Sequence, residues 1–426
     1  MTPMRDKEFF TKLFRAAVDA ANPERVIASH LPPRPKGRTI VIGAGKGSAQ
    51  MASAFEKAWT AKYPDSSIEG LVVTRYGFGV ACEHIEIIEA SHPVPDAAGL
   101  VASKRLLETV SDLTADDLVI ALVSGGGSAL LPSPPDGMTI EDEIAVNKVL
   151  LASGAPISAM NAVRKHLSAI KGGRLAAAAF PARVYSLVVS DIPGDNPAFV
   201  ASGPTVPDET TREEALAIVD RYSLDLPAAA LAHLQSHAAD APKPGDAVFK
   251  GHEHHVIASA GVSLEAAAKV ARENGIEAVI LSDAIEGEAR EVAHVHAALA
   301  KHVLAKGQPF TKPVVILSGG ETTVTVRGKG KGGRNTEFLL SLAMDIDGAN
   351  GISAFAADTD GIDGSEDNAG AFADSTTVAR LLAKGQDASA YLNGNNAWTA
   401  FDAIGDLFVP GPTGTNVNDL RAILVR

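Results

Sequence analysis

The stretch DLVIALVSGGGSALL, from Asp117 to Leu131, joins an apolar segment directly to three consecutive glycines. A short apolar run that is bounded by turn residues is typical of a strand buried on both faces. The glycines at its end allow a ligand to approach the backbone closely. The stretch therefore predicts a buried parallel strand whose carboxyl end contacts a ligand through Ser124, Gly125, Gly126, Gly127 and Ser128.

Other strand-like segments on both sides of this stretch end in polar or glycine residues in the same way. RTIVIGAGKGS (38–48) runs into Gly45 and Lys46, and VYSLVVSDIPGD (184–195) runs into Asp191 and Asp195. Helical patterns such as DAAGLVASKRLLETV (96–110) separate the strands. Strands that alternate with helices need crossover connections, so the sequence predicts a mostly parallel α/β sheet with ligands at the carboxyl ends of its strands.

A segment rich in Ala, Pro and Asp interrupts this alternation, which then resumes. It predicts an N-terminal domain over residues 1–240, a linker over 241–251 and a C-terminal domain over 252–426. The HEHH run beside the linker has no Cys partner and no HExxH pattern, and is interpreted as exposed linker chemistry. Two α/β domains that face each other across a cleft are the simplest interpretation.

Bulk composition excludes several classes of protein. The formal net charge of -13 argues against general nucleic-acid binding, which needs a basic face. The single cysteine, Cys82, allows neither an intramolecular disulfide nor a Cys-based zinc site. The first fifteen residues carry charges throughout and have no apolar core of a signal peptide, and no apolar run reaches membrane-spanning length. The sequence therefore predicts a cytoplasmic protein that binds neither a membrane nor nucleic acid.

This acidic chain nevertheless gathers four cationic residues on the glycine-rich stretch RGKGKGGR (327–334), among them Lys331 and Arg334. Free backbone N–H groups and positive charge together suit a compact anion such as a phosphate. Asn335 is a good N-cap for a helix that begins near Thr336, so Arg334 is expected beside a helix N-terminus with free N–H groups.

GAGKGS (43–48) also lies between a predicted strand and a helix. It fails as a Walker A loop, and it is a near miss of the dinucleotide-binding fingerprint because Ser48 replaces the third glycine. Arg75 stands where that fingerprint has an acidic residue, and an arginine there could accept the 2′-phosphate of NADP. A tight turn with Lys46 in water is the structural alternative.

NAVRKHLSAIKGGR (161–174) is predicted to be helical as far as Lys171, which places Arg164 and Lys171 on one face. Two basic residues on a helix more often form a solvated face than a binding site. Two glycines precede Arg174, so its placement stays open.

Carboxylates cluster in AADTDGIDG (356–364), where Asp358, Asp360 and Asp363 follow a predicted strand. The segment fails as an EF-hand, because position 6 is not glycine and position 12 is not glutamate. Clustered carboxylates do suit Mg²⁺, which takes one or two of them together with substrate phosphates. Asp191 with Asp195, and Glu321, are further candidate ligands, and a turn rich in Asp and Gly is the alternative for each.

Glycine loops, cations and carboxylates at strand ends are together what phosphoryl transfer needs. The motifs GAGKGSAQMA, SGGGSALLPSP, NAVRKHLSAIKGGRLA, SDIPGDNPAFVASGPTVPD, LSGGETTVTVRGKGKGGRNTEF, AADTDGIDG and GPTGTNVNDL also occur in an order that resembles the glycerate 2-kinase or MOFRL family, from about residue 8 to 422. The resemblance implies a larger Rossmann-like N-terminal domain and a smaller C-terminal α/β domain, with the active site in the cleft between them.

The resemblance also implies an activity and a set of site residues. The activity is the transfer of a phosphate from ATP, with Mg²⁺, to D-glycerate, giving 2-phosphoglycerate. Lys46 and Arg334 look like the principal catalytic cations. The wider candidate set for substrate and phosphate is Gly45, Ser124, Gly125, Gly126, Gly127, Ser128, Arg164, Lys171, Arg174 and Lys331, and the set for the metal is Asp191, Asp195, Glu321, Asp358, Asp360 and Asp363.

Two other functions remain open at this point. Relatives of this family are often labelled hydroxypyruvate reductase, which would be an NAD(P)H-dependent enzyme, and the near-fingerprint with Arg75 is the support for it. A non-catalytic regulator that binds a sugar acid or a nucleotide would not need so many charged residues at strand ends. A monomer or a homodimer is expected.

Overall fold

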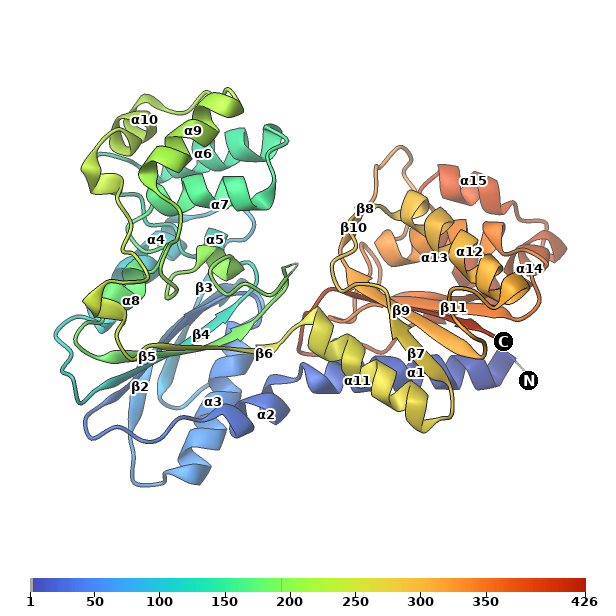
Figure 1. Cartoon of the computed structure of the whole chain (residues 1–426), viewed down its shortest axis with the longest axis horizontal. Coiled ribbons are helices and arrows are strands. Elements are labelled where there is room, and N and C mark those ends of the chain that lie inside the picture. Colours follow the sequence, from blue (N-terminus) through green and yellow to red (C-terminus); the bar gives the residue numbers. More distant parts are fainter. Residues whose placement is uncertain (1–2, 193) are drawn as a thin grey trace. The chain divides into compact units, whose positions relative to one another are not determined.

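The computed structural model describes residues 3–192 and 194–426, which form two compact units (Figure 1). Pro23–Ile257 make up the first, here called the N-terminal unit. The residues up to Asn22 together with Ala258–Arg426 make up the second, the C-terminal unit. In the part of the chain that the structure describes, no helix is both long and apolar enough to cross a lipid bilayer.

The sheet of the N-terminal unit has the strand order β3-β2-β1-β4-β5-β6, and its pairs from β3 to β5 are parallel. This order is the Rossmann type, and it confirms the predicted parallel α/β fold. The strands are β1 (Thr39–Ala44), β2 (Ile68–Arg75), β3 (Ile85–Ala90), β4 (Leu118–Ser124), β5 (Arg183–Val189) and β6 (Glu253–Ala258).

Helices cover both faces of this sheet, with α3 on one face and α4 and α8 on the other (Figure 1). The α-helices of the unit are α2 (Pro23–Val26), α3 (Ser48–Lys62), α4 (Ala97–Thr109), α5 (Gly127–Leu130), α6 (Ile140–Ala152), α7 (Ile157–His166), α8 (Arg174–Ala178), α9 (Arg212–Arg221) and α10 (Ala228–Leu234). Because both faces are covered, β1 and β4 are buried along their whole length.

The main sheet of the C-terminal unit is mixed, with the order β13-β12-β11-β14-β9-β7. Its strands are β7 (Glu277–Ile280), β9 (Val314–Gly320), β11 (Ile352–Asp358), β12 (Gly370–Asp374), β13 (Leu407–Phe408) and β14 (Asp419–Val425), and β8 (Gly287–Glu288) and β10 (Thr322–Thr323) form a separate pair. The central strand β14 runs antiparallel to both β9 and β11. Its first residue, Asp419, therefore lies at the edge where β9 and β11 end, opposite Gly320 and Asp358.

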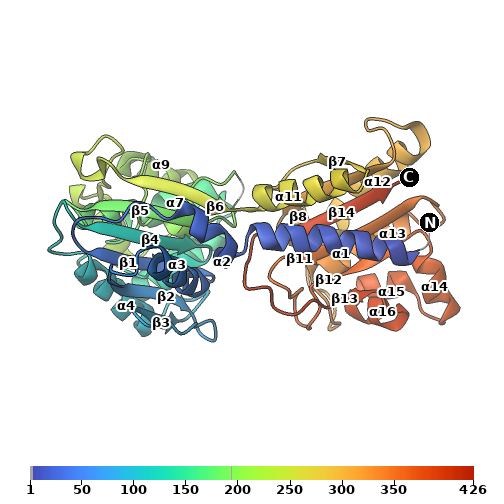
Figure 2. The same ribbon diagram turned by 90° about the horizontal axis from the view of Figure 1, so that it is seen from below.

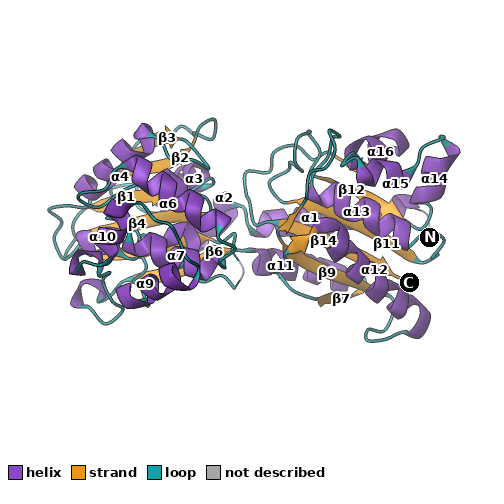
Figure 3. Cartoon of the chain, turned by 90° about the horizontal axis from the view of Figure 1, so that it is seen from above, coloured by secondary structure: helices purple, strands orange, loops and turns teal. Residues whose placement is uncertain are grey.

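Alternate residues of β9 enter two different cores, as the period of a strand requires. Val314 and Ile316 pack with α12 and α13, whereas Val315 and Leu317 pack with α1 and α11. The helices of the unit are α1 (Pro3–Ala20), α11 (Ala260–Glu273), α12 (Ala289–Lys306), α13 (Arg334–Asp345), α14 (Thr377–Ala383), α15 (Ala388–Asn393) and α16 (Ala397–Ile404). Figure 2 shows α1 beside α11 on one face of the sheet, and Figure 3 shows α12 and α13 over the strands.

The observed division of the chain differs from the predicted domains at two places. The opening helix α1 packs its aromatic residues against Phe355 of the C-terminal sheet, although it comes first in the chain. The segment after the expected linker forms β6, which extends the N-terminal sheet. The chain therefore enters the C-terminal unit twice, and hydrophobic periodicity alone does not reveal which core a helix joins.

The predicted helix from Asn161 to Lys171 is too long. Helix α7 ends at His166, and the Ser168 hydroxyl accepts the N–H groups of Ile170 and Lys171 in a turn. Arg164 and Lys171 therefore do not share a helix face, because a local side-chain acceptor replaces the helical hydrogen bonds there.

Candidate active site

Two glycine loops meet at the carboxyl ends of β1 and β4, between the neighbouring strands where the strand order reverses. The Lys46 N–H donates to the Gly125 carbonyl at 2.8 Å, and the Gly47 N–H donates to Ser124 Oγ at 3.0 Å. A Cβ at Gly45 would lie 2.1 Å from Ser124 Oγ. The loops are thus locked to each other, at the position where open α/β sheets bind ligands.

Side chains that favour an anion converge beside these loops. A Cβ at Gly126 would lie 2.9 Å from Lys46 Cγ and 3.1 Å from His92 Nε2, so Lys46 and His92 share the space above this glycine. Burial, followed by the positive charges of Lys46 and Arg75, lowers the pKa of His92 to about 4. The His92 imidazole is therefore neutral at pH 7, and Lys46 and Arg75 supply the positive charge.

His92 was missed by sequence reasoning. It lies two residues beyond β3, as Lys46 lies two residues beyond β1. The rule that ligands bind at the carboxyl ends of parallel strands would have found it if it had been applied to every strand.

Asp191 lies beside the second glycine loop. A Cβ at Gly125 would come within 1.7 Å of Asp191 Oδ2, so only glycine leaves room for this carboxylate. Asp195, further along the same loop, has a left-handed backbone with φ of 52°. Of these two candidate metal ligands, the structure places Asp191 against the glycine loop.

Arg164 is connected to the same loop by hydrogen bonds. Ser128 Oγ lies 2.8 Å from Ser202 Oγ, which donates to Asn161 Oδ1 at 3.2 Å. Arg164 reaches this Asn161 oxygen at 3.5 Å and donates from Nε to Asn147 at 2.7 Å. Ala201 and Ser202 both have positive φ, a strained conformation that is frequent at functional sites.

Lys171 and Arg174 have protein partners instead. Lys171 Nζ forms a buried ion pair with Glu143 at 2.5 Å. Arg174 donates to the backbone carbonyls of Lys165, Lys171, Ala239 and Asp240. Both side chains therefore hold loops together, and we do not retain them among the candidate binding residues.

The C-terminal unit holds Arg334 with three carboxylates. Its Nε donates to Asp419 at 2.9 Å, its Nη2 donates to Asp358 at 2.5 Å, and its Nη1 lies 3.2 Å from Glu321. Burial by itself lowers the pKa of Arg334, but the charges of these carboxylates outweigh it and raise the pKa above its usual value. Arg334 is thus a permanent cation in a fixed orientation.

Asp419 is the principal residue that sequence reasoning missed. Its side chain is fully buried, and it also accepts hydrogen bonds from Asn335 Nδ2 at 2.7 Å and from the buried Arg421 at 2.5 Å. Asp419 is the first residue of β14, so the rule that ligands bind at the carboxyl ends of strands does not point to it. Burial and the nearby Asp419 charge raise the pKa of Asp358.

Asp363 has a structural role. Its carboxylate accepts the backbone N–H groups of Asn335 and Thr336, both at 2.9 Å, at the start of α13. The helix begins at Arg334 with Gly333 as its N-cap, so the prediction of Asn335 as the N-cap is wrong. These two N–H groups serve the Asp363 carboxylate rather than a bound anion. Burial raises the pKa of Asp363 to about 6.

The predicted metal carboxylates do not form a metal site by themselves. Both oxygens of Asp363 are used in capping, Asp358 bonds Arg334 and the Asp360 N–H, and Asp360 accepts the Ile362 N–H. Within residues 3–192 and 194–426, no three His, Cys, Asp or Glu side chains are grouped so that they could hold a metal ion. A metal that binds here would need ligands from a substrate.

Lys331, the other candidate on the glycine-rich stretch, has partners within the protein. Its Nζ lies 3.2 Å from Glu366 and over the ring of Trp398. The glycines of this stretch are needed for packing. Cβ atoms at Gly328 and Gly330 would lie 2.2 Å from the Gly394 carbonyl oxygen and 2.4 Å from Asn396 Cβ.

The N-terminal unit is Rossmann-like and carries cations at its glycine loops. The C-terminal unit is an α/β unit that fixes an arginine among carboxylates. Together these features are those of an α/β enzyme that acts on small anions. Family models match residues 9–235 as a domain of unknown function, DUF4147, and residues 314–419 as the MOFRL family. The chain belongs to the glycerate 2-kinase family, because relatives of that name are 36–38% identical to it over nearly its whole length.

Relatives match this chain over nearly its whole length. D-glycerate 2-kinase of Thermotoga maritima is 38% identical, over 97% of both chains. A crystal structure of glycerate kinase from T. maritima superposes with a TM-score of 0.90 at 37% identity, over 100% of both chains. A protein of Agrobacterium vitis with the provisional name hydroxypyruvate reductase is 52% identical, over 98% of this chain and 94% of its own.

Proposed function

We propose that the protein transfers the γ-phosphate of ATP to the 2-hydroxyl of D-glycerate, giving 2-phosphoglycerate and ADP. The observation that carries this proposal is Arg334, a partly buried cation that three carboxylates hold in one orientation. Phosphoryl transfer depends mainly on positioned cations that stabilise the charge of the transferred group. The similarity to a D-glycerate 2-kinase over nearly the full chain supports the choice of substrates.

Each unit supplies one of the two principal cations in this proposal. Arg334 stabilises the charge that develops on the transferred phosphate. Lys46, at the glycine loops of the N-terminal unit, attracts the transferred phosphate or the phosphorylated product. Arg164 offers the glycerate carboxylate a bidentate partner, connected to Ser128 through Ser202 and Asn161.

Mg²⁺ enters this proposal with ATP rather than as a resident ion. Around Arg334, the carboxylates Asp358, Asp419 and Glu321 outnumber the cations Arg334 and Arg421. Because Mg²⁺ usually takes one or two carboxylates together with substrate phosphates, the ion arrives with the nucleotide. Glu321, whose side chain is half exposed, and Asp191 remain the candidate ligands.

Hydroxypyruvate reduction is the second candidate, because the Agrobacterium relative carries that name and the strand order is of the Rossmann type. Arg75 at the end of β2 stacks on Phe78, and its Nε is a buried donor without an acceptor in the described structure. Against this candidate, Ser48 fills the place of the third fingerprint glycine and lies 3.1 Å from Ser124 Oγ.

Parallel assays of the purified protein separate the two candidates. We expect ADP formation from D-glycerate, ATP and Mg²⁺, and no oxidation of NADH or NADPH with hydroxypyruvate. The reverse result would favour the reductase. The cytoplasmic location, the monomeric or homodimeric state and an active site in a cleft between the units stay predictions.

A further inference from the structure

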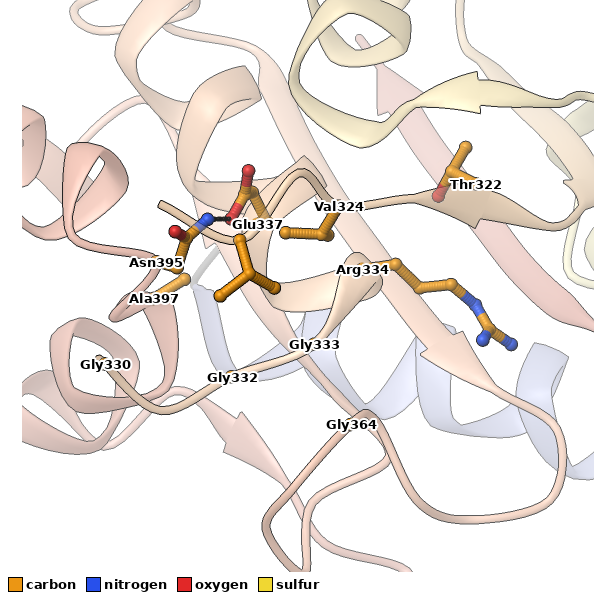
Figure 4. Close-up of a pocket in the computed structure, with 11 residues that line it drawn as sticks. Thr322, Val324, Gly330, Gly332, Gly333, Arg334, Glu337, Gly364, Asn395 and Ala397 are labelled. Carbon is orange, nitrogen blue, oxygen red and sulfur yellow. Dashed lines mark hydrogen bonds between the residues drawn. The ribbon is translucent and has the colours of Figure 1, made fainter. Parts of the chain in front are cut away.

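A pocket of about 250 Å³ opens in the C-terminal unit beside Arg334 (Figure 4). Val324, Val326 and Ala397 give it apolar walls, and Gly332 and Gly333 lie along its edge. Figure 4 shows the guanidinium of Arg334 at one end, pointing away from Ala397. The pocket thus has an apolar part and an end at which the Arg334 guanidinium lies among carboxylates.

The polar groups at the back of the pocket are already satisfied. Glu337, which is buried, forms an ion pair with Arg290 at 2.6 Å and accepts a hydrogen bond from Asn395 Nδ2 at 2.9 Å. Asn395 Oδ1 in turn accepts the N–H groups of Arg327 and Gly328. A ligand therefore meets a preformed wall with no unpaired charge at the back, which suits an uncharged group.

The exposed side chain of Val326 also favours an apolar occupant. Val326 is 75% exposed although it lines the pocket, and Val324, two residues earlier, lines it too. A ligand that covered these two side chains would remove apolar surface from water. D-glycerate is small and polar throughout, so it has no part that would use these walls.

We propose that this pocket binds the base and ribose of the nucleotide, whose phosphates extend to Arg334. The inference rests on the proposed kinase function and assigns the two substrates to different units. The nucleotide occupies the C-terminal unit, and D-glycerate uses the glycine loops and Arg164 of the N-terminal unit. The Rossmann-like sheet then serves a small anion rather than the nucleotide.

The test is a calorimetric titration of Val326→Asn with ADP, which binds without reacting, and separately with pyrophosphate and D-glycerate. Asparagine has a similar volume and replaces the apolar contact with a polar group, so we expect a roughly ten-fold weaker affinity for ADP. The affinities for pyrophosphate and D-glycerate should not change. Val295→Asn, at a 69% exposed valine on α12 outside this pocket, is the matched control and should bind ADP like the wild type.

The outcomes separate this inference from the proposed function. If Val326→Asn binds ADP normally while the wild type phosphorylates glycerate, the pocket assignment is wrong and the kinase function stands. If the wild type binds ADP in the predicted way but forms no phosphoglycerate, the pocket assignment stands and the choice of acceptor is wrong. A wild type that binds no ADP, or a variant that loses affinity for D-glycerate instead, overturns the assignment.

Discussion

Asp419 shows how one buried carboxylate fixes a candidate catalytic cation. It accepts from Arg334 Nε with both oxygens, at 2.9 and 3.1 Å, and it also bonds Asn335 and Arg421. Its position follows from β14 running against its neighbours, which places the first residue of that strand at the edge where β9 and β11 end. Asp419 is therefore a positioning residue for Arg334.

We expect Asp419→Asn to lower kcat by roughly 10²-fold, because the guanidinium loses the charge that orients it. The variant also leaves Arg421 without its buried carboxylate, so it should lose stability. Steady-state kinetics and chemical unfolding measure the two effects. Asp406→Asn is the matched control, because Asp406 is also buried and pairs with Lys7 and Arg380 in the same unit. The control should lose stability and keep its kcat, and an equal loss of kcat in both would make the effect merely structural.

Asp363 gives a prediction about pH. Its pKa is raised from 3.8 to about 6 by burial, so the folded protein keeps this proton when the unfolded chain has already lost it. The resulting stabilisation is complete below about pH 4 and is lost as the pH rises through 6. The unfolding free energy of the wild type, relative to Asp363→Asn, should fall by on the order of 3 kcal/mol between these values. Denaturant unfolding from pH 3.5 to 7 measures it, and a difference that rises with pH would show that the capping hydrogen bonds outweigh burial.

At this scale the sequence located the candidate cations but did not distinguish the carboxylates. Lys46 and Arg334 both lie among glycines; Lys46 follows β1, and Arg334 begins α13 and pairs with Asp358 at the end of β11. Asp358, Asp360 and Asp363 look equivalent in the sequence, yet one bonds Arg334, one accepts a turn N–H and one caps α13. Such roles depend on contacts with residues far away in the chain.

Among the elements, strands followed by polar residues were predictable, whereas β14, which begins with its polar residue, was not. Strands β1, β4 and β5 are continuous apolar runs that end in glycine or acidic residues, and they lie side by side as expected. The same rule found β9 and β11 but ignored β14, whose functional residue comes first. The end of α7 was missed because Ser168 supplies a local acceptor that competes with the helix.

The opening helix α1 belongs to the C-terminal unit through its aromatic residues. Phe10 stacks on Phe355 with ring centroids 5.9 Å apart, and Phe14 meets the same ring edge-on. We expect Phe10→Ala to cost roughly 3–5 kcal/mol, because it removes a large buried side chain from this core. Hydrogen exchange should show lost protection in β11 and β14 and unchanged protection in β1 and β4.

Phe55→Ala in α3 provides the reciprocal control. Phe55 is fully buried and stacks on Trp59 in the N-terminal unit. Its loss should reduce protection in β1 and β4 and leave β11 and β14 unchanged. If Phe10→Ala instead loosened the N-terminal sheet, the assignment of α1 to the C-terminal unit would be wrong.

For the whole molecule, the proposed function requires both units, because each carries one principal cation. Lys46→Ala should reduce kcat by roughly 10²-fold or more, since a preorganised donor at the reacting group contributes about that much. Arg334→Ala should cost about 3–5 kcal/mol of transition-state stabilisation, by analogy with arginines worth 10³–10⁵ in rate. Turnover measured on folded variants tests both. Near-normal turnover in either variant would show that the substituted residue takes no part in the mechanism.

The position of the new phosphate tests the central claim most directly. Wild-type protein is incubated with D-glycerate, ATP and Mg²⁺, and phosphorus NMR identifies the product, with Arg334→Ala treated in parallel. The predicted result is 2-phosphoglycerate with an equal amount of ADP in the wild type, and neither product in the variant. Formation of 3-phosphoglycerate would contradict the assigned acceptor, and the absence of any phosphoglycerate beside rapid NAD(P)H-dependent reduction of hydroxypyruvate would contradict the kinase function itself.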